Sequence, residues 1–155
     1  CYMKPSELVN KKVEDMCKKY DITKLRTLAV IFRGTDAEIR ENSLDDYLEK
    51  TSNIIRDHSI EQIIIQTDQR QVRNIFMESF ECPCRFMDEL PDTDGSVCMH
   101  FVPDAIEDKD EWTLNLFAMV EALSKSDSIL TYTGNIGLFI SLWGLEMGNK
   151  VYQLR

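Results

Sequence analysis

The sequence has no long apolar run and little positive charge. No hydrophobic stretch approaches the length of a transmembrane helix and the start does not resemble a signal peptide, so we expect a soluble globular chain. There are 18 Lys and Arg residues against 27 Asp and Glu, which gives a net charge of -9. A nucleic-acid surface needs clustered Lys and Arg, so this balance argues against a nucleic-acid partner. A small anionic ligand is still compatible with one local arginine and backbone amides.

The common metal-binding and nucleotide-binding motifs are also missing. The five cysteines lack the paired spacing of a zinc site, and His58 and His100 have no ligand-type residue at a suitable spacing. We therefore expect free thiols, no metal and no cofactor. Neither a Walker lysine signature nor a G-x-G-x-x-G sequence is present, which disfavours the typical NTPase and dinucleotide-binding classes.

The length and composition fit one compact domain. With 155 residues, 43% of them hydrophobic, and a mean hydropathy of -0.29, the chain can bury a sizeable core. It begins with Cys1 rather than methionine, within what resembles the lead-in to a helix. We therefore expect residues 1–155 to form a single domain that is a fragment of a longer protein.

The periodicity of apolar residues predicts strands and helices that alternate along the chain. Helices are expected at 5–20, 43–56, 69–80, 112–124 and 135–147, and strands at 27–32, 62–66, 84–87, 128–132 and 150–154. The consecutive isoleucines at 63–65 are typical of a parallel strand that is covered on both faces. This alternation predicts a doubly wound, Rossmann-like α/β sheet of about five mostly parallel strands, with helices on both faces.

Some local features sharpen this prediction. Ser6 and Ser43 are placed to cap the first two helices. Aromatic and methionine side chains on helical stripes are expected in the core, namely Phe117, Met119, Phe139 and Trp143. A long acidic segment at 88–110, with a strand turn expected at 97–101, is of a length that commonly carries function.

Ligands of open parallel sheets bind beyond the carboxyl ends of the strands, so the residues that follow each strand form the candidate site. They are Arg33, Gly34 and Asp36 after the first strand, Thr67, Asp68 and Gln69 after the second, and Thr131, Thr133, Gly134 and Asn135 around the end of the fourth. A buried strand needs no charge at its end for folding. The arginine therefore points to an anion above the sheet, although pairing with a nearby carboxylate is the alternative.

The segment 131–135 and Asp68 each allow two interpretations. Hydroxyls and a glycine at a helix N-terminus can hold a phosphate, because the first backbone N–H groups have no partner within the helix. Thr133 or Asn135 could equally cap that helix without any ligand. Asp68 could cap the following helix or accept hydrogen bonds from a nucleobase. The sequence alone leaves these alternatives open.

Together, the three strand ends resemble the donor-binding lobe of GDP-fucose-dependent fucosyltransferases, a group that includes α-1,6-fucosyltransferases, bacterial nodulation fucosyltransferases and protein O-fucosyltransferases. The family motif His-x-Arg-x-x-Asp matches residues 31–36 except at Ile31. A strand ending in Thr-Asp before an acidic or amide residue matches residues 67–69. A strand followed by small hydroxyl residues matches residues 131–135, where Gly134 replaces a hydroxyl that the family often has. The three motifs occur in the same order at similar spacing.

The resemblance implies the C-terminal lobe of a two-lobed B-type glycosyltransferase. Such a lobe would bind GDP-fucose for transfer to a glycan or protein acceptor by a metal-independent inverting mechanism. Arg33 would bind the β-phosphate and stabilise the leaving nucleotide. Thr131 and Thr133 would assist at the phosphates, and Asp68 or Gln69 would contact guanine.

The acceptor lobe of such an enzyme is not recognisable in this chain, so two interpretations remain. The chain is either the excised lobe of a larger transferase or a noncatalytic α/β module that binds a nucleotide or a partner. A receiver-like phosphoacceptor domain fits less well, because its acidic cluster should follow the first strand, where Arg33 stands.

Overall fold

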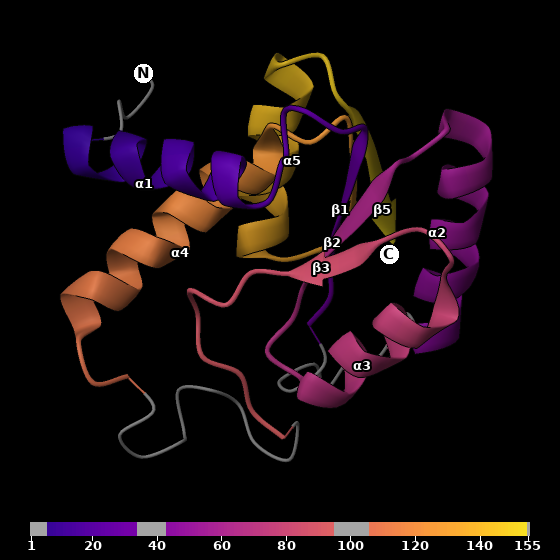
Figure 1. Ribbon diagram of the computed structural model, residues 1–155, viewed down its shortest axis with the longest axis horizontal. Coiled ribbons are helices and arrows are strands. Elements are labelled where there is room, and N and C mark those ends of the chain that lie inside the picture. Colours follow the sequence, from indigo (N-terminus) through magenta and orange to yellow (C-terminus); the bar gives the residue numbers. More distant parts are fainter. Residues whose placement is uncertain (1–5, 34–42, 95–105, 155) are drawn as a thin grey trace.

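The computed structural model describes residues 6–33, 43–94 and 106–154, and it shows one five-stranded sheet between two layers of helices (Figure 1). The elements are α1 (Glu7–Lys19), β1 (Thr27–Ile31), α2 (Leu44–His58), β2 (Gln62–Gln66), α3 (Arg70–Ser79), β3 (Cys84–Phe86), α4 (Lys109–Ser124), β4 (Ser128–Tyr132), α5 (Asn135–Glu146) and β5 (Lys150–Leu154). All paired strands are parallel, in the order β3-β2-β1-β4-β5. The predicted doubly wound α/β fold is confirmed.

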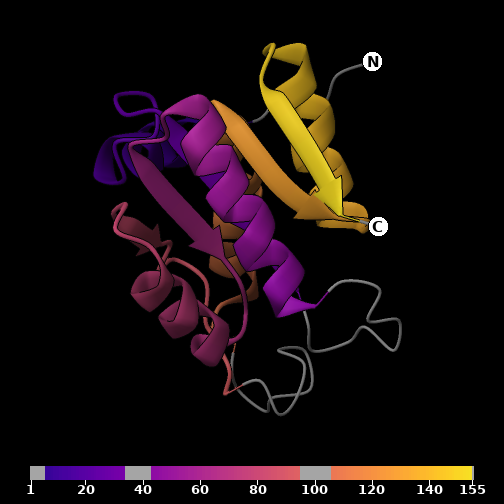
Figure 2. The ribbon, with the colours of Figure 1, turned by 90° about the vertical axis from the view of Figure 1, so that its right-hand side faces the viewer.

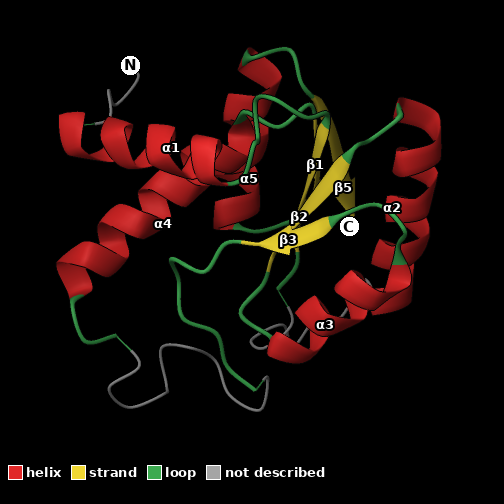
Figure 3. Cartoon of the chain, in the orientation of Figure 1, coloured by secondary structure: helices red, strands yellow, loops and turns green. Residues whose placement is uncertain are grey.

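The helices divide into two groups, one on each face of the sheet. α1, α4 and α5 cover one face, and α2 and α3 cover the other (Figure 3). The view from the side shows α2 and α5 on opposite sides of the β4 and β5 edge (Figure 2). None of the helices in the described part is long and apolar enough to cross a membrane.

The central strands are apolar throughout because both of their faces are covered. Every residue of β1 is buried, with Leu28 and Val30 packed in the cluster of α2 and α3, and with Ala29 and Ile31 in the cluster of α1, α4 and α5. Side chains alternate between the faces of a strand, so a strand buried on both faces needs an unbroken apolar run. The residues of the edge strand β3 are only half-buried.

The expected caps of the first two helices are confirmed. Ser6 Oγ accepts a hydrogen bond from the Val9 N–H at 3.3 Å. Ser43 and Asp46 form a capping box, in which each side chain accepts from the backbone N–H of the other residue.

α4 begins three residues earlier than the apolar pattern predicted, at Lys109 rather than Trp112. The cause is Asp108, whose Oδ1 accepts hydrogen bonds from the backbone N–H groups of Asp110 and Glu111, both at 2.9 Å. Periodicity places only the apolar turns of a helix, whereas the cap fixes where it starts.

The core prediction was wrong for two of its four aromatic and methionine positions. Met119 is buried and Trp143 is packed against the core, but Phe117 and Phe139 are 49% and 53% exposed. α5 is apolar on all sides, with Leu138, Leu142 and Leu145 also exposed, so its sequence does not indicate which side faces the sheet. The strand turn predicted at 97–101 lies outside the described residues.

Candidate functional site

A pocket of about 220 Å³ lies where the carboxyl ends of β1, β2 and β4 meet. β1 and β4 are neighbours in the sheet, and the chain leaves them in opposite directions, through α2 on one face and α5 on the other. This is the topological switch point, the place at which open α/β sheets bind their ligands. The pocket is lined by residues from six parts of the chain: Ile31, Phe32, Arg33, Gln66, Thr67, Asp68, Leu90, Pro91, Ile106, Trp112, Leu116, Met119, Tyr132 and Ile136.

The polar side of this pocket comes from two of the predicted strand ends. Arg33 follows β1 and is exposed, whereas Thr67 and Asp68 follow β2 and are half-buried. The carboxyl ends of adjacent parallel strands meet at one edge, which is why residues so far apart in sequence share the pocket. Gly34 and Asp36 lie outside the described residues.

Gln69 lies beside the pocket rather than among its lining residues. It is the N-cap residue of α3, and its side chain makes no capping hydrogen bond. Its backbone N–H donates to Thr67 Oγ1 at 3.1 Å, and it forms an isolated parallel bridge with Thr93. The N-cap position of α3 therefore belongs to Gln69, and Asp68 precedes it.

The N-terminus of α5 has no side-chain cap. Its N-cap residue is Gly134, which cannot supply one, and Asn135 is the exposed first residue of the helix. The hydroxyl of Thr133 instead accepts a hydrogen bond from Gln153 Nε2 at 3.1 Å. The alternative in which Thr133 or Asn135 caps this helix was thus wrong, whereas α1, α2 and α4 are each capped by a side chain.

Thr131 is fully buried beneath the first turn of α5. A Cβ added at Gly137 would lie 2.5 Å from Thr131 Oγ1 and 2.4 Å from the carbonyl oxygen of Tyr132. Only a glycine permits so close an approach of the helix to the end of β4. Within the described part of the chain, Thr131 Oγ1 has no hydrogen-bond partner. A buried hydroxyl that could donate and accept hydrogen bonds therefore lies at the N-terminus of α5, which has no side-chain cap.

Sequence reasoning missed the apolar wall of the pocket. Trp112, Leu116 and Met119 come from α4, and Leu90 and Pro91 come from the connection between β3 and α4. The length of that connection was a signal of function, but nothing in the sequence showed that it returns to the β1 and β2 ends. A mostly apolar pocket with a few polar groups on one side is typical of small-molecule sites.

Two further arginines near this edge are already paired. Asp92 forms ion pairs with Arg70 at 2.7 Å and with Arg73 at 2.8 Å. The hydrogen bond from Arg70 is the main reason why the pKa of Asp92 lies below its usual range. Neither of these arginines lines the pocket, whereas Arg33 is a cationic side chain that does, among the described residues.

The thiols in the described regions are not activated. Cys17, Cys82 and Cys84 are free, and burial raises the pKa of each of them, in Cys84 to about 12. The thiolate is the form that attacks substrates and binds metals, so these thiols are poor candidates for either role near neutral pH. The described residues contain no group of three or more His, Cys, Asp or Glu side chains that could hold a metal ion.

The comparison with solved structures supports the fold. No family model and no curated protein match the sequence. A crystal structure of POFUT1 in its apo form superposes with a TM-score of 0.60 at 9% sequence identity, over 96% of this chain and 46% of that chain. The chain thus spans a little under half the length of the POFUT1 chain, and it shares the α/β fold of that part of POFUT1.

Proposed function

We propose that this chain is the donor-binding lobe of a fucosyltransferase-like glycosyltransferase that uses GDP-fucose. POFUT1, with which it shares its fold, is a protein O-fucosyltransferase. The fold likeness and the order of the three strand-end motifs support the proposal independently of each other. The acceptor, a glycan or a protein, would be held by a part of the enzyme outside this lobe.

The observation that carries the proposal is that Arg33 and the first turn of α5, whose N-terminus has no side-chain cap, lie at the same pocket. A helix N-terminus without a side-chain cap presents unpaired N–H groups and a partial positive charge. Thr131 is buried beneath that turn and does not line the pocket, so Arg33 and the backbone N–H groups of the helix would bind the phosphates. A guanidinium and a helix N-terminus both suit the binding of phosphate, and a nucleotide-sugar diphosphate carries two phosphates.

This arrangement suits the departure of a nucleoside diphosphate. The leaving group gains negative charge as the bond between the sugar and the β-phosphate breaks, and a guanidinium can neutralise that charge through two parallel hydrogen bonds. In an inverting transfer, the acceptor hydroxyl would attack the opposite side of the sugar carbon in the same step. Arg33 would therefore act mainly in the transition state, where the charge is largest.

One substitution favours a second function, a module that binds nucleotide without transferring sugar. Ile31 stands where the family motif has a histidine, and its buried, apolar side chain lines the pocket. It cannot form the hydrogen bond that a histidine would offer to the nucleotide. Binding of GDP without turnover of GDP-fucose by the complete protein would support this second function.

The first test is base choice. A carboxylate at Asp68 can accept two hydrogen bonds from the N1–H and N2–H₂ edge of guanine, but uracil offers no matching pair of donors. We expect calorimetry to show GDP binding roughly 5- to 150-fold tighter than UDP, which corresponds to about 1–3 kcal/mol for a well-formed pair of bonds. Asp68→Ala should abolish this preference.

An exposed carboxylate on α1, Asp15, provides the matched control, because Asp15→Ala should leave both affinities unchanged. A preference for GDP that survives Asp68→Ala would place the base contact elsewhere, for example on Gln69. If neither nucleotide binds the wild-type protein, the proposed function is wrong.

The second test is metal dependence. The proposal assigns the phosphate charge to Arg33 and to the α5 N-terminus, so no cation is needed to bridge the phosphates. We expect the affinity for GDP to be the same in EDTA as in excess Mg²⁺ or Mn²⁺. The EDTA concentration is about 1 mM, enough to remove weakly bound metal. A strict requirement for Mn²⁺ would instead show that carboxylates such as Asp68 bind the metal and nucleotide together.

A further inference from the structure

Residues 87–94 form a strap along one wall of the pocket. The strap follows β3 and crosses toward the end of β2, and its middle residues Leu90 and Pro91 line the pocket. Leu90 also packs against the core cluster of α1, α4 and α5. The strap has no regular secondary structure apart from one bridge at Thr93, so its position depends on how its two ends are held.

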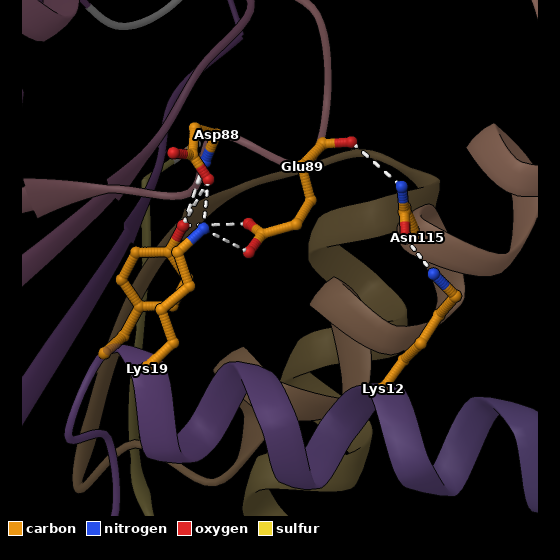
Figure 4. Close-up of polar contacts among 6 residues, drawn as sticks. Lys12, Lys19, Asp88, Glu89 and Asn115 are labelled. Carbon is orange, nitrogen blue, oxygen red and sulfur yellow. Dashed lines mark hydrogen bonds and ion pairs between the residues drawn. The ribbon is translucent and has the colours of Figure 1, made fainter.

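The first end of the strap is held by α1 (Figure 4). Lys19 forms ion pairs with Asp88 and, at 2.9 Å, with Glu89. Tyr20 Oη lies 2.9 Å from a carboxylate oxygen of each of these residues, and it accepts a hydrogen bond from the Asp88 N–H at 3.1 Å. Burial is the main cause that raises the pKa of Tyr20 to about 12, so its hydroxyl keeps the proton that it donates to a carboxylate.

α4 holds the same end of the strap through Asn115. Its Nδ2 donates to the backbone carbonyl of Glu89 at 3.1 Å, and its Oδ1 accepts from Lys12 Nζ at 2.9 Å (Figure 4). Lys12 in turn is paired with Glu111 at 2.6 Å. One amide side chain therefore connects α1, α4 and the residue that immediately precedes Leu90.

The second end of the strap is bound to the β2 to α3 turn. Thr93 directs both its backbone N–H and its hydroxyl to the carbonyl oxygen of Asp68, at 2.7 Å and 3.1 Å. Its own carbonyl accepts from the Arg70 N–H at 3.1 Å. Thr93 is buried, and it fixes the backbone of a polar residue that lines the pocket.

We propose that the strap determines which ligand the pocket accepts, and that Asn115 and Thr93 are the positioning residues that set it. Asn115 binds the Glu89 carbonyl and thereby positions Leu90 in the apolar wall. Thr93 binds the Asp68 carbonyl and thereby positions the side-chain carboxylate of Asp68. The geometry carries this inference. Thr93 contacts the backbone of Asp68, which lines the pocket, and Asn115 contacts the backbone of Glu89, which immediately precedes the pocket-lining residue Leu90. The identity of the ligand rests on the proposed function, whereas the role of the strap does not.

A ligand-free experiment tests the Asn115 contact. The sequence has two tryptophans, so Trp143→Phe leaves Trp112, which shares the pocket with Leu90, as the only fluorescent indole. In that background, Asn115→Ala is expected to raise the acrylamide quenching constant of Trp112 about twofold, because a loosened strap exposes the ring. The control Asn10→Ala removes an exposed amide from α1 and should not change the quenching constant.

A ligand experiment tests the Thr93 contact. Thr93→Val keeps the size and the backbone hydrogen bonds of the residue but removes its hydroxyl. We expect GDP affinity to fall about three- to tenfold, the usual effect of one hydrogen bond, with UDP affinity nearly unchanged. Thr93→Ser should restore the wild-type ratio, and circular dichroism melting curves should show that each variant is folded.

The outcomes distinguish this inference from the proposed function. If the wild-type protein binds neither nucleotide, the proposed function fails and the quenching measurement alone decides the role of the strap. Unchanged quenching in Asn115→Ala overturns the inference. Where GDP binds, an equal loss of GDP and UDP affinity in Thr93→Val, or no loss of either, also overturns it, because a purely structural residue would not change the ratio.

Discussion

Replacing Gly137 by alanine is expected to destabilise the protein by about 1–3 kcal/mol, in the range of overpacked cores, although alanine is the better helix former. The added Cβ would lie 2.4 Å from the Tyr132 carbonyl oxygen and 2.5 Å from Thr131 Oγ1. The first of these is a backbone atom of β4 in a residue that pairs with Leu154 of β5, so it cannot move without disturbing that pairing. α5 would therefore have to move away from the sheet.

Gly144 provides the matched control on the same helix. A Cβ at Gly144 would meet Ile129 Cδ1 at 2.4 Å, the far end of a side chain that can rotate away. Urea unfolding should therefore show a clearly smaller loss for Gly144→Ala than for Gly137→Ala. If the two variants lose equal stability, the close approach of α5 to the end of β4 is not the cause. If neither loses any, this approach does not exist in solution.

The elements of the fold could be predicted because each has a local cause. The isoleucines of β2 form a run that only a strand covered on both faces requires, and Ser6 and Ser43 place two helix starts through hydrogen bonds within one turn. Parallel strands end at a common edge, so Arg33, Thr67 and Asp68 were expected together and do line one pocket.

The rest of the site depends on contacts between distant parts of the chain, which a sequence pattern does not encode. α5 is apolar on every side, so only the packed structure shows that Gly137 and Gly144 face the sheet while Phe139 faces outward. Thr131 is buried beneath α5 and does not line the pocket, because Gly137 lets the first turn of α5 approach the end of β4 closely. The apolar wall of the pocket joins the strap to α4, and nothing local to either segment indicates this contact.

Replacing Arg33 by alanine is expected to weaken GDP binding by about 1.5–3 kcal/mol, the usual worth of a hydrogen bond to a charged group, or roughly 10- to 150-fold. Arg33 is the cationic side chain that lines the pocket within the described residues, and it lies at the end of β1 beside the uncapped helix α5. Calorimetric titration with GDP measures the loss. Fluorescence of Trp112 in the Trp143→Phe background gives an independent binding curve, since that ring lines the same pocket.

Guanosine and Arg33→Lys together show whether the lost energy comes from the phosphates. Guanosine has no phosphate, so Arg33→Ala should weaken GDP binding while leaving guanosine binding unchanged. Arg33→Lys keeps the charge but loses the planar fork that can bind two oxygens at once, and it should recover only part of the affinity. Arg56 is an exposed arginine near the C-terminal end of α2, and Arg56→Ala is the control for a general loss of positive charge. This variant should bind GDP as tightly as the wild type.

Equal affinity of wild type and Arg33→Ala for GDP would exclude Arg33 from the site. An equal loss for GDP and guanosine would show that Arg33 supports the pocket rather than the phosphates.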